Sequence, residues 1–279
     1  MASQSATATA RGASEVPGVP ALEVQGVTMR FGGLTALDDV CFEVPSGVVH
    51  GVIGPNGAGK TTLLNVLSGL QKPTAGTFTV HGDDAARWPA HRIVGRGGVV
   101  RTFQTVRLFS SMTVREHLVV AARAVGGSSA ESRHDSVARV LDRLSLTAVA
   151  DAKAASLPYG LQRRLELGRA LASGPRLLLL DEPAAGLNPE ERRRLGKDIT
   201  ELATEGVTVV LIEHHMDLVQ SVCGTATVLN FGAVIAGGAI AAVMREPAVL
   251  EAYLGSGHDE QPAGADLDEA GHDDERARP

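Results

Sequence analysis

The chain of 279 residues is 44% hydrophobic and 21% charged, which is the balance of a folded globular protein rather than a disordered one. Its formal net charge is −6, and residues 256–279, with eight acidic and two basic side chains, carry all of that excess. The neutral remainder argues against a nucleic-acid-binding protein, and no apolar run reaches the ~20 residues of a membrane span. We therefore expect any membrane role to come through a partner.

Two segments of biased composition flank one continuous pattern of strands and helices. Residues 1–20 are rich in Ala, Ser, Thr, Gly and Pro, and we predict a disordered N-terminal arm there and a disordered acidic tail at 256–279. Residues 21–255 contain no internal repeat and are predicted to form a single domain. Short apolar runs bounded by turn residues predict strands at 22–27, 40–44, 48–53, 77–81, 177–180 and 207–212.

Helix signals lie between these strands. A helix is predicted from residue 60 to about 67, Thr113 and Glu116 form a capping box that opens another, and Asn188 caps a third. Residues from about 106 to 158 show helix signals and almost no strand signal, so we predict a helical subdomain inserted there. Strands alternating with helices indicate an α/β fold with a mainly parallel sheet covered on both faces.

A glycine-rich turn after the predicted strand at 48–53 matches the phosphate-binding pattern G-x-x-x-x-G-K-[ST]. Its glycines let the backbone approach phosphates closely, and successive N–H groups at the helix start supply positive partial charge. We expect Lys60 to bind the β- and γ-phosphates of ATP, Thr61 to ligate Mg²⁺ and Thr62 to bond the α-phosphate. The turn consists of Gly54, Pro55, Asn56, Gly57, Ala58, Gly59, Lys60 and Thr61.

Two adjacent acids follow the predicted strand at 177–180. Asp181 lies at the carboxyl end of that strand, where parallel sheets place their ligands, and is expected to hold Mg²⁺ through water. Glu182 is expected to be the general base for the water that attacks the γ-phosphate. Such a pair alone is more typical of a solvated loop, but together with the phosphate loop it predicts a nucleotide hydrolase.

Further motifs make residues 21–255 resemble the ATP-binding cassettes of ABC transporters. Gln104 matches the Q-loop glutamine of that family, and His214, directly after a predicted strand, matches its switch histidine, although His215 beside it is a second candidate. Phe31 matches the aromatic residue that stacks on adenine. The signature loop is matched by residues 157–164 (LPYGLQRR), and the D-loop by residues 185–188 (AGLN).

The resemblance implies a fold and a mechanism. The fold would have a P-loop (RecA-like) core of mainly parallel sheet, an antiparallel β subdomain and the inserted helical subdomain. Gln104 would reach Mg²⁺ and the attacking water, and His214 would bond the γ-phosphate and hold Glu182 in line. The signature loop would close over ATP bound to a second ATPase subunit, so the resemblance implies a dimer. The expected contacts of this loop with nucleotide come from Tyr159, Gly160 and Gln162.

The signature loop and the D-loop depart from the usual family pattern. Pro158 stands where the signature serine would contact the partner's γ-phosphate, Tyr159 replaces the first glycine, and Leu161 takes the usual glutamine place. Asn188 replaces the aspartate of the D-loop. Because the phosphate loop and the acid pair are intact, we interpret these changes as variation within a branch rather than as a loss of hydrolysis.

Several segments resemble one branch, the ATPase subunits of high-affinity branched-chain amino-acid uptake systems. The resemblance implies a second ATPase subunit, identical or different, two transmembrane permease subunits, and indirectly an extracytoplasmic substrate-binding protein. It also implies a peripheral position on the cytoplasmic face of the plasma (inner) membrane and no nucleic-acid partner. The segments are residues 31–37, 101–104, 112–114, 159–166, 181–189, 211–214 with 216, and 252–255.

The sequence leaves the cargo open, because an ATPase subunit does not touch the transported molecule. Related cassettes that serve urea or amide uptake, or lipopolysaccharide export, share much of the pattern. A soluble ABC ATPase that acts on ribosomes or DNA is an alternative of another class. Those proteins usually hold two cassettes or a long coiled-coil insertion, and this sequence shows neither.

Overall fold

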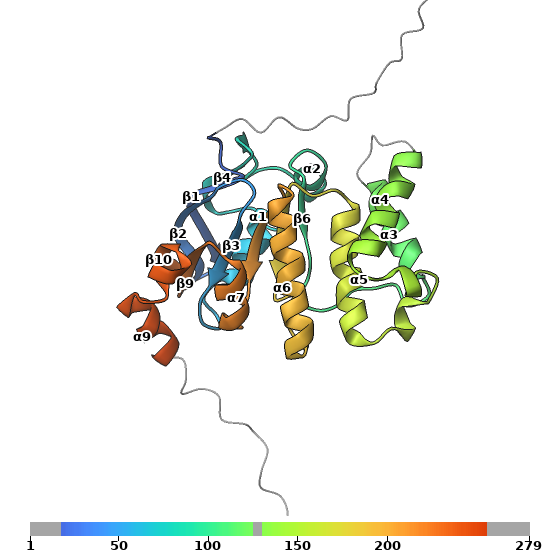
Figure 1. Ribbon diagram of the computed structural model, residues 1–279. Coiled ribbons are helices and arrows are strands. Elements are labelled where there is room, and N and C mark those ends of the chain that lie inside the picture. The colour runs from blue at the N-terminus through green and yellow to red at the C-terminus, as the bar shows by residue number, and fades with distance from the viewer. Residues whose placement is uncertain (1–17, 125–129, 256–279) are drawn as a thin grey trace, which may run out of the picture.

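The structure is a computed structural model that describes residues 18–124 and 130–255 (Figure 1). The predicted acidic tail, and the predicted N-terminal arm apart from residues 18–20, therefore lie outside the described residues. None of the helices in the described ranges is both long enough and apolar enough to cross a lipid bilayer.

A six-stranded sheet forms the centre of the molecule. Its neighbouring strands are parallel except for the antiparallel pair at one edge. In order across the sheet, the strands are β10 (Ala233–Ala239), β9 (Thr225–Asn230), β3 (Val49–Ile53), β8 (Thr208–Ile212), β7 (Leu177–Asp181) and β6 (Val99–Arg101). Every residue of β3, β7 and β8 is buried, as expected for apolar strands covered on both faces.

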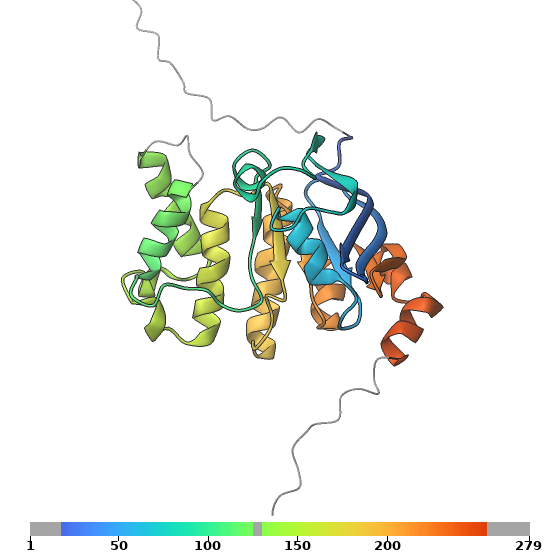
Figure 2. The same cartoon turned by 180° about the vertical axis from the view of Figure 1, so that it is seen from behind.

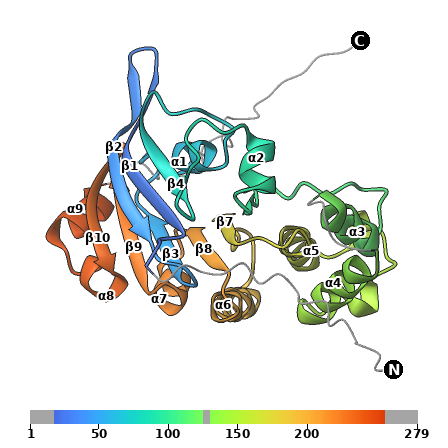
Figure 3. The same ribbon diagram turned by 90° about the horizontal axis from the view of Figure 1, so that it is seen from above.

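Successive residues of the central strands enter two different hydrophobic cores. In β7, Leu177 and Leu179 pack into the core that contains α1 (Lys60–Leu67), whereas Leu178 and Leu180 pack into the core on the other face. This alternation follows from the pleat of a strand, which points neighbouring side chains to opposite faces. Figure 3 shows α1 on one side of the sheet and α6 (Pro189–Thr204) and α7 (Met216–Val222) on the other.

A smaller antiparallel sheet lies on the same side as α1 (Figure 3). Its strands, in order, are β2 (Leu34–Val44), β1 (Leu22–Phe31), β4 (Ala75–Val80) and β5 (Asp83–Asp84). Cys41 lies in β2 and is exposed, and its Sγ accepts a hydrogen bond from the Gly26 N–H at 3.1 Å. The short α2 (Ala90–Gly95) leads from this sheet back to β6.

The helices between β6 and β7 gather at one end of the molecule, as Figures 1 and 2 show from opposite sides. Gly168 allows their close packing, since a Cβ at this position would lie 3.1 Å from side-chain carbons of both Leu118 and Leu144. The elements are α3 (Val114–Ala124), α4 (Ala130–Arg143), the 3₁₀ turns η1 (Thr147–Val149) and η2 (Ala154–Ser156), and α5 (Tyr159–Ala172). After β10 follow α8 (Ile240–Val243) and α9 (Pro247–Gly255).

Both predicted helix caps are confirmed. The Thr113 N–H donates to Glu116 Oε2 at 2.7 Å, and the Glu116 N–H donates to Thr113 Oγ1 at 3.2 Å at the start of α3. At the start of α6, the Asn188 side chain accepts from the backbone N–H of Glu191, whose carboxylate accepts from the Asn188 N–H in return. Each cap satisfies N–H groups that the first turn leaves unpaired.

His50 in β3 makes unfolding dependent on pH. Its buried ring contacts the Thr225 hydroxyl at 2.8 Å and the Thr227 hydroxyl at 3.0 Å, and burial lowers the pKa of His50 to about 4. Histidine in an unfolded chain titrates near 6.5, so the unfolded state binds more protons than the folded state between these values. The free energy of unfolding should therefore fall by about 3 kcal/mol as pH drops from about 6.5 to 4.

The variant His50→Gln tests this source of acid sensitivity. It removes the titrating ring, so its free energy of unfolding should decrease less steeply with falling pH than that of the wild type. Urea denaturation at several pH values between 7 and 4 measures both slopes. The pKa of His81 is also lowered to about 4. His81 is present in both proteins, so its contribution to the pH dependence cancels when the two slopes are compared. Parallel slopes would show that His50 is not the group responsible.

Candidate functional site: a nucleotide cleft

The phosphate loop joins β3 to α1, as predicted. Its Gly54, Gly57 and Gly59 all have positive φ, at 147°, 78° and 102°. A Cβ on Gly54 would lie 2.0 Å from the carbonyl oxygen of Leu229, and one on Gly59 would lie 2.6 Å from that of Ala36. Only glycine fits these two positions, because both the backbone conformation and the space exclude a side chain.

Lys60 crosses the inside of this loop. Its Nζ donates to the carbonyl oxygens of Gly54 at 2.6 Å and Pro55 at 2.9 Å, and the residue is 8% exposed. Desolvation lowers the pKa of Lys60, against the opposing effect of the nearby carboxylates of Glu182 and Asp181, which raise it. The loop thus holds a cation beside its own backbone N–H groups, which is the arrangement that binds phosphates.

Asp181 ends β7 and is buried, with 4% of its surface exposed. Its Oδ2 accepts from Arg101 Nη2 at 2.8 Å, and Arg101 Nη1 donates to Asn65 Oδ1 of α1 at 2.6 Å. The arginine at the carboxyl end of β6 therefore neutralises the buried acid and ties it to the helix after the phosphate loop. The sequence pattern did not assign Arg101 a role.

Glu182 has φ of +46°, which is a strained conformation for a residue with a Cβ. Its Oε2 accepts from Gln104 Nε2 at 2.8 Å and lies 3.8 Å from Nδ1 of His214. Three residues predicted from separate motifs thus meet at one carboxylate. The neighbouring His215 turns elsewhere, since its Nδ1 lies 2.9 Å from Glu213 Oε2.

Glu213 is a further residue that no sequence motif singled out. Its side chain is fully buried, and Oε1 accepts from the Ala184 N–H at 2.8 Å while Oε2 accepts from the His214 N–H at 3.1 Å. One carboxylate therefore joins the loop after Glu182 to the loop that carries His214. These bonds fix the relative positions of the two segments.

The phosphate loop and Glu182 border an open cleft of about 540 Å³. Phe31 lies at its edge with 44% of its surface exposed, so its ring is accessible to a planar ligand. Positive charge and N–H groups at the loop, with apolar surface at the edge, suit a nucleoside triphosphate. The predicted residues that line the cleft are Phe31, Asn56, Gly57, Ala58, Gly59, Lys60, Thr61, Thr62, Gln104 and Glu182.

The predicted signature residues do not line this cleft. Tyr159 begins α5, and its hydroxyl donates to the carbonyl oxygen of Ala185 at 3.2 Å. Gln162 Nε2 donates back to the carbonyl oxygen of Leu157 at 2.9 Å. Gly160 faces α6, where a Cβ would lie 2.0 Å from Glu191 Oε1. Within one chain, this helix start therefore packs against the D-loop and α6 rather than against the phosphate loop.

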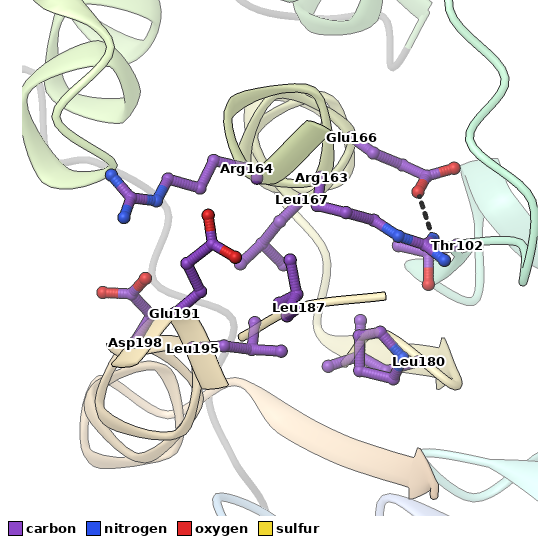
Figure 4. Close-up of a pocket in the computed structure, with 12 residues that line it drawn as sticks. Thr102, Arg163, Arg164, Glu166, Leu167, Leu180, Leu187, Glu191, Leu195 and Asp198 are labelled. Carbon is purple, nitrogen blue, oxygen red and sulfur yellow. Dashed lines mark hydrogen bonds and ion pairs between the residues drawn. The ribbon is translucent and has the colours of Figure 1, made fainter. Parts of the chain in front are cut away.

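Arg163, one turn further along α5, joins the start of this helix to the loop that carries Gln104. Its guanidinium donates to Tyr159 Oη at 3.0 Å, to the carbonyl oxygen of Phe103 at 3.3 Å, and also to the carbonyl oxygen of Gln104. It forms a buried ion pair with Glu166 at 3.0 Å, which Figure 4 shows beside the narrow pocket between α5 and α6. The Gln104 loop and the start of α5 are therefore held by one side chain.

Comparison with known proteins agrees with this geometry. The family model described as ABC transporter matches residues 37–185. The high-affinity branched-chain amino acid transport ATP-binding protein BraF of Pseudomonas aeruginosa is 45% identical, over 85% of this chain and 98% of that protein. The chain belongs to the ABC transporter family. LivG of Escherichia coli, which carries the same description, is 42% identical over 85% of this chain and 98% of its own.

Solved structures place the ABC transporter subunit in the same fold. The ADP conformation of MJ1267, an ATP-binding cassette of an ABC transporter, superposes with a TM-score of 0.78 at 31% identity. The match covers 85% of this chain and 99% of that one. The predicted α/β fold is confirmed, and so is the identification of the chain as an ATP-binding, ATP-hydrolysing subunit.

The Arg163–Glu166 pair gives a test of how this ABC subunit holds its helix start. Arg163→Ala should lower the free energy of unfolding by about 3–5 kcal/mol, because it leaves the buried Glu166 carboxylate without its cation. Urea denaturation measures this loss. The double variant with Glu166→Ala should regain part of it, and Arg193→Ala, at an exposed position of α6, is the control. Equal losses in the single and double variants would contradict the explanation.

Proposed function

We propose that the chain is the ATPase subunit of an importer of branched-chain amino acids. The descriptions of BraF and LivG support this cargo, because the chain matches each of these relatives over 98% of its length. The subunit would sit on the cytoplasmic face of the membrane, joined to a second ATPase subunit and two permease subunits. An extracytoplasmic binding protein would deliver the amino acid to the permeases.

ATP would lie in the cleft with its phosphates at Lys60 and the loop N–H groups and its base against Phe31. The site residues also fit a Mg²⁺ ion, because Thr61, Gln104 and Asp181 offer oxygen atoms, the donors that this ion prefers. When bound, the ion would neutralise charge that develops on the transferred phosphate.

The observation that best supports ATP hydrolysis at this site is the strained conformation of Glu182 at the edge of the phosphate cleft. Its carboxylate would accept a proton from the attacking water, and the 2.8 Å bond from Gln104 and the nearby His214 would keep it aligned. Strain at a residue that bears chemistry is common, since the surrounding structure has to hold a conformation that the chain alone avoids.

A second ATPase subunit would complete each site. Tyr159, Gly160 and Gln162 stand apart from the cleft of their own chain, so their proposed nucleotide contacts would be made across the dimer. The first turn of α5 would offer its N–H groups to the γ-phosphate of the partner's ATP. Binding would then close the pair, and hydrolysis would reopen it and move the permeases between their access states.

A groove beside Gln104 suits the permease contact. It has a volume of about 260 Å³ and lies between α3, α5 and the segment after β6. Phe109 and Val120 line it with 63% and 52% of their surfaces exposed, and together they form an apolar patch of the kind that marks interaction sites. A permease segment seated there would lie next to Phe103 and could sense the position of Gln104.

Reconstitution tests the proposal. The subunit, purified with its partner ATPase and permeases and placed in liposomes with the binding protein outside, should accumulate labelled leucine only when ATP is enclosed. Urea serves as the comparison cargo. ATP-dependent uptake of urea without uptake of leucine would overturn the cargo assignment, and recovery of the chain with ribosomes rather than permeases would overturn transport.

A further inference from the structure

Phe231 is the most exposed large apolar residue that the described part of the chain contains, with 89% of its surface accessible. It lies in the two-residue turn between β9 and β10, where Asn230 pairs with Ala233. Both central residues of the turn have positive φ, 45° at Phe231 and 82° at Gly232. This is the geometry of a type I′ hairpin, which strongly prefers Asn-Gly, Asp-Gly or Gly-Gly. A bulky residue there is strained and exposed at once.

The turn is fixed against the nucleotide cleft. The Gly232 N–H donates to the carbonyl oxygen of Ala58 in the phosphate loop at 3.0 Å, and the Gly232 carbonyl accepts from the Asp38 N–H at 2.9 Å. A Cβ on Gly232 would lie 2.8 Å from the carbonyl oxygen of Ala36. The backbone that carries Phe231 is therefore tied to both the phosphate loop and β2.

This anchoring leaves the Phe231 side chain on the wall of the cleft that also contains Phe31 and Leu34. These three apolar side chains border one cavity and are exposed by 89%, 44% and 66% respectively. None of them is buried by the folded chain. A planar apolar ligand that entered beside Phe31 would cover surface that the protein alone leaves in water.

We propose that Phe231 is a second residue that contacts the base of the bound nucleotide, together with Phe31, and so contributes to the selection of a nucleotide over bare phosphates. The inference rests on the proposed placement of the base at Phe31. The strained turn would then persist because the phenyl ring contributes to binding rather than to folding. This reverses the usual expectation that an apolar side chain is retained for stability.

The variant Phe231→Asn separates these two effects, because it supplies the preferred Asn-Gly turn and removes the ring. Its melting temperature without ligand should rise by about 2–4 °C, as strain is relieved. Its affinity for ADP with Mg²⁺ should fall about fivefold or more, which is the loss that removal of one base–aromatic contact produces. Its affinity for pyrophosphate with Mg²⁺ should not change, because pyrophosphate has no base.

Isothermal titration calorimetry of the full chain measures both ligands. Phe231→Tyr should keep ADP affinity, and Leu250→Ala, which removes another exposed apolar side chain away from the cleft, is the control. An ADP affinity that is unchanged in Phe231→Asn, or that falls together with pyrophosphate affinity, would overturn the inference. Failure of the wild type to bind ADP at all would instead overturn the proposed nucleotide site.

Discussion

Replacement of Glu182 by glutamine is expected to lower ATP hydrolysis by about 10²–10⁴-fold while ATP binding persists. The amide cannot take a proton from water, but its oxygen can still accept the bond that Gln104 now donates to Glu182 Oε2 at 2.8 Å. ATP should therefore accumulate in a closed dimer. Phosphate release by the assembled transporter measures turnover, and size-exclusion chromatography with ATP measures dimer formation.

The control for this substitution is Glu190→Gln, which makes the same chemical change at an exposed position in the first turn of α6. It should leave hydrolysis near the wild-type rate. If the Glu182→Gln transporter turned over at full rate, Glu182 would not be the general base, and another group would have to accept the proton.

Lys60→Ala should have its effect one step earlier, on binding. Each charge-assisted hydrogen bond from this ammonium to a phosphate contributes about 1.5–3 kcal/mol, so the loss should weaken ATP binding by at least about tenfold. Isothermal titration calorimetry with ATP gives the affinity. Lys72→Ala, in the turn after α1 and away from the cleft, should change little.

A second effect is expected for Lys60→Ala. The carbonyl oxygens of Gly54 and Pro55 now accept from Nζ at 2.6 and 2.9 Å, and both would lose that donor. A partial loss of stability should therefore accompany the loss of affinity. Unchanged ATP affinity in this variant would show that Lys60 and its loop do not bind the phosphates of ATP.

The parts of the fold that sequence reasoning predicts are those with strong local signals. The strands at 177–180 and 207–212 have continuous apolar runs, and the helix caps have capping residues at fixed spacing. The edge strands β6 and β10 of the large sheet were missed, and so was β9 beside β10, whose apolar residues Ala226, Val228 and Leu229 are interrupted by Thr227. β6 has three residues and ends in Arg101, and β10 contains two glycines and three alanines, so neither has the apolar run that marks a buried strand.

The candidate site shows the same division between local and tertiary information. The phosphate-loop and acid-pair motifs are contiguous, so the sequence pattern alone identifies their residues. The long-range bonds of Arg101, Arg163 and Glu213 span separations from 29 to 80 residues along the chain, and no local pattern predicts them. Arg101 lies at the carboxyl end of a parallel strand, where such sheets gather ligands, but this position could not be used because β6 was not predicted from the sequence.

The Arg163 contacts described above have a consequence for a pair of subunits. The Arg163 guanidinium donates a hydrogen bond to the backbone of Gln104, a residue that lines the cleft of its own chain. It also donates to Tyr159 at the start of α5, which would face the neighbouring chain. A shift of the Gln104 loop is therefore expected to displace the start of α5 as well. ATP binding in one subunit would then be transmitted through the planar guanidinium of Arg163 to the start of α5, and so would change the contact between that subunit and its partner.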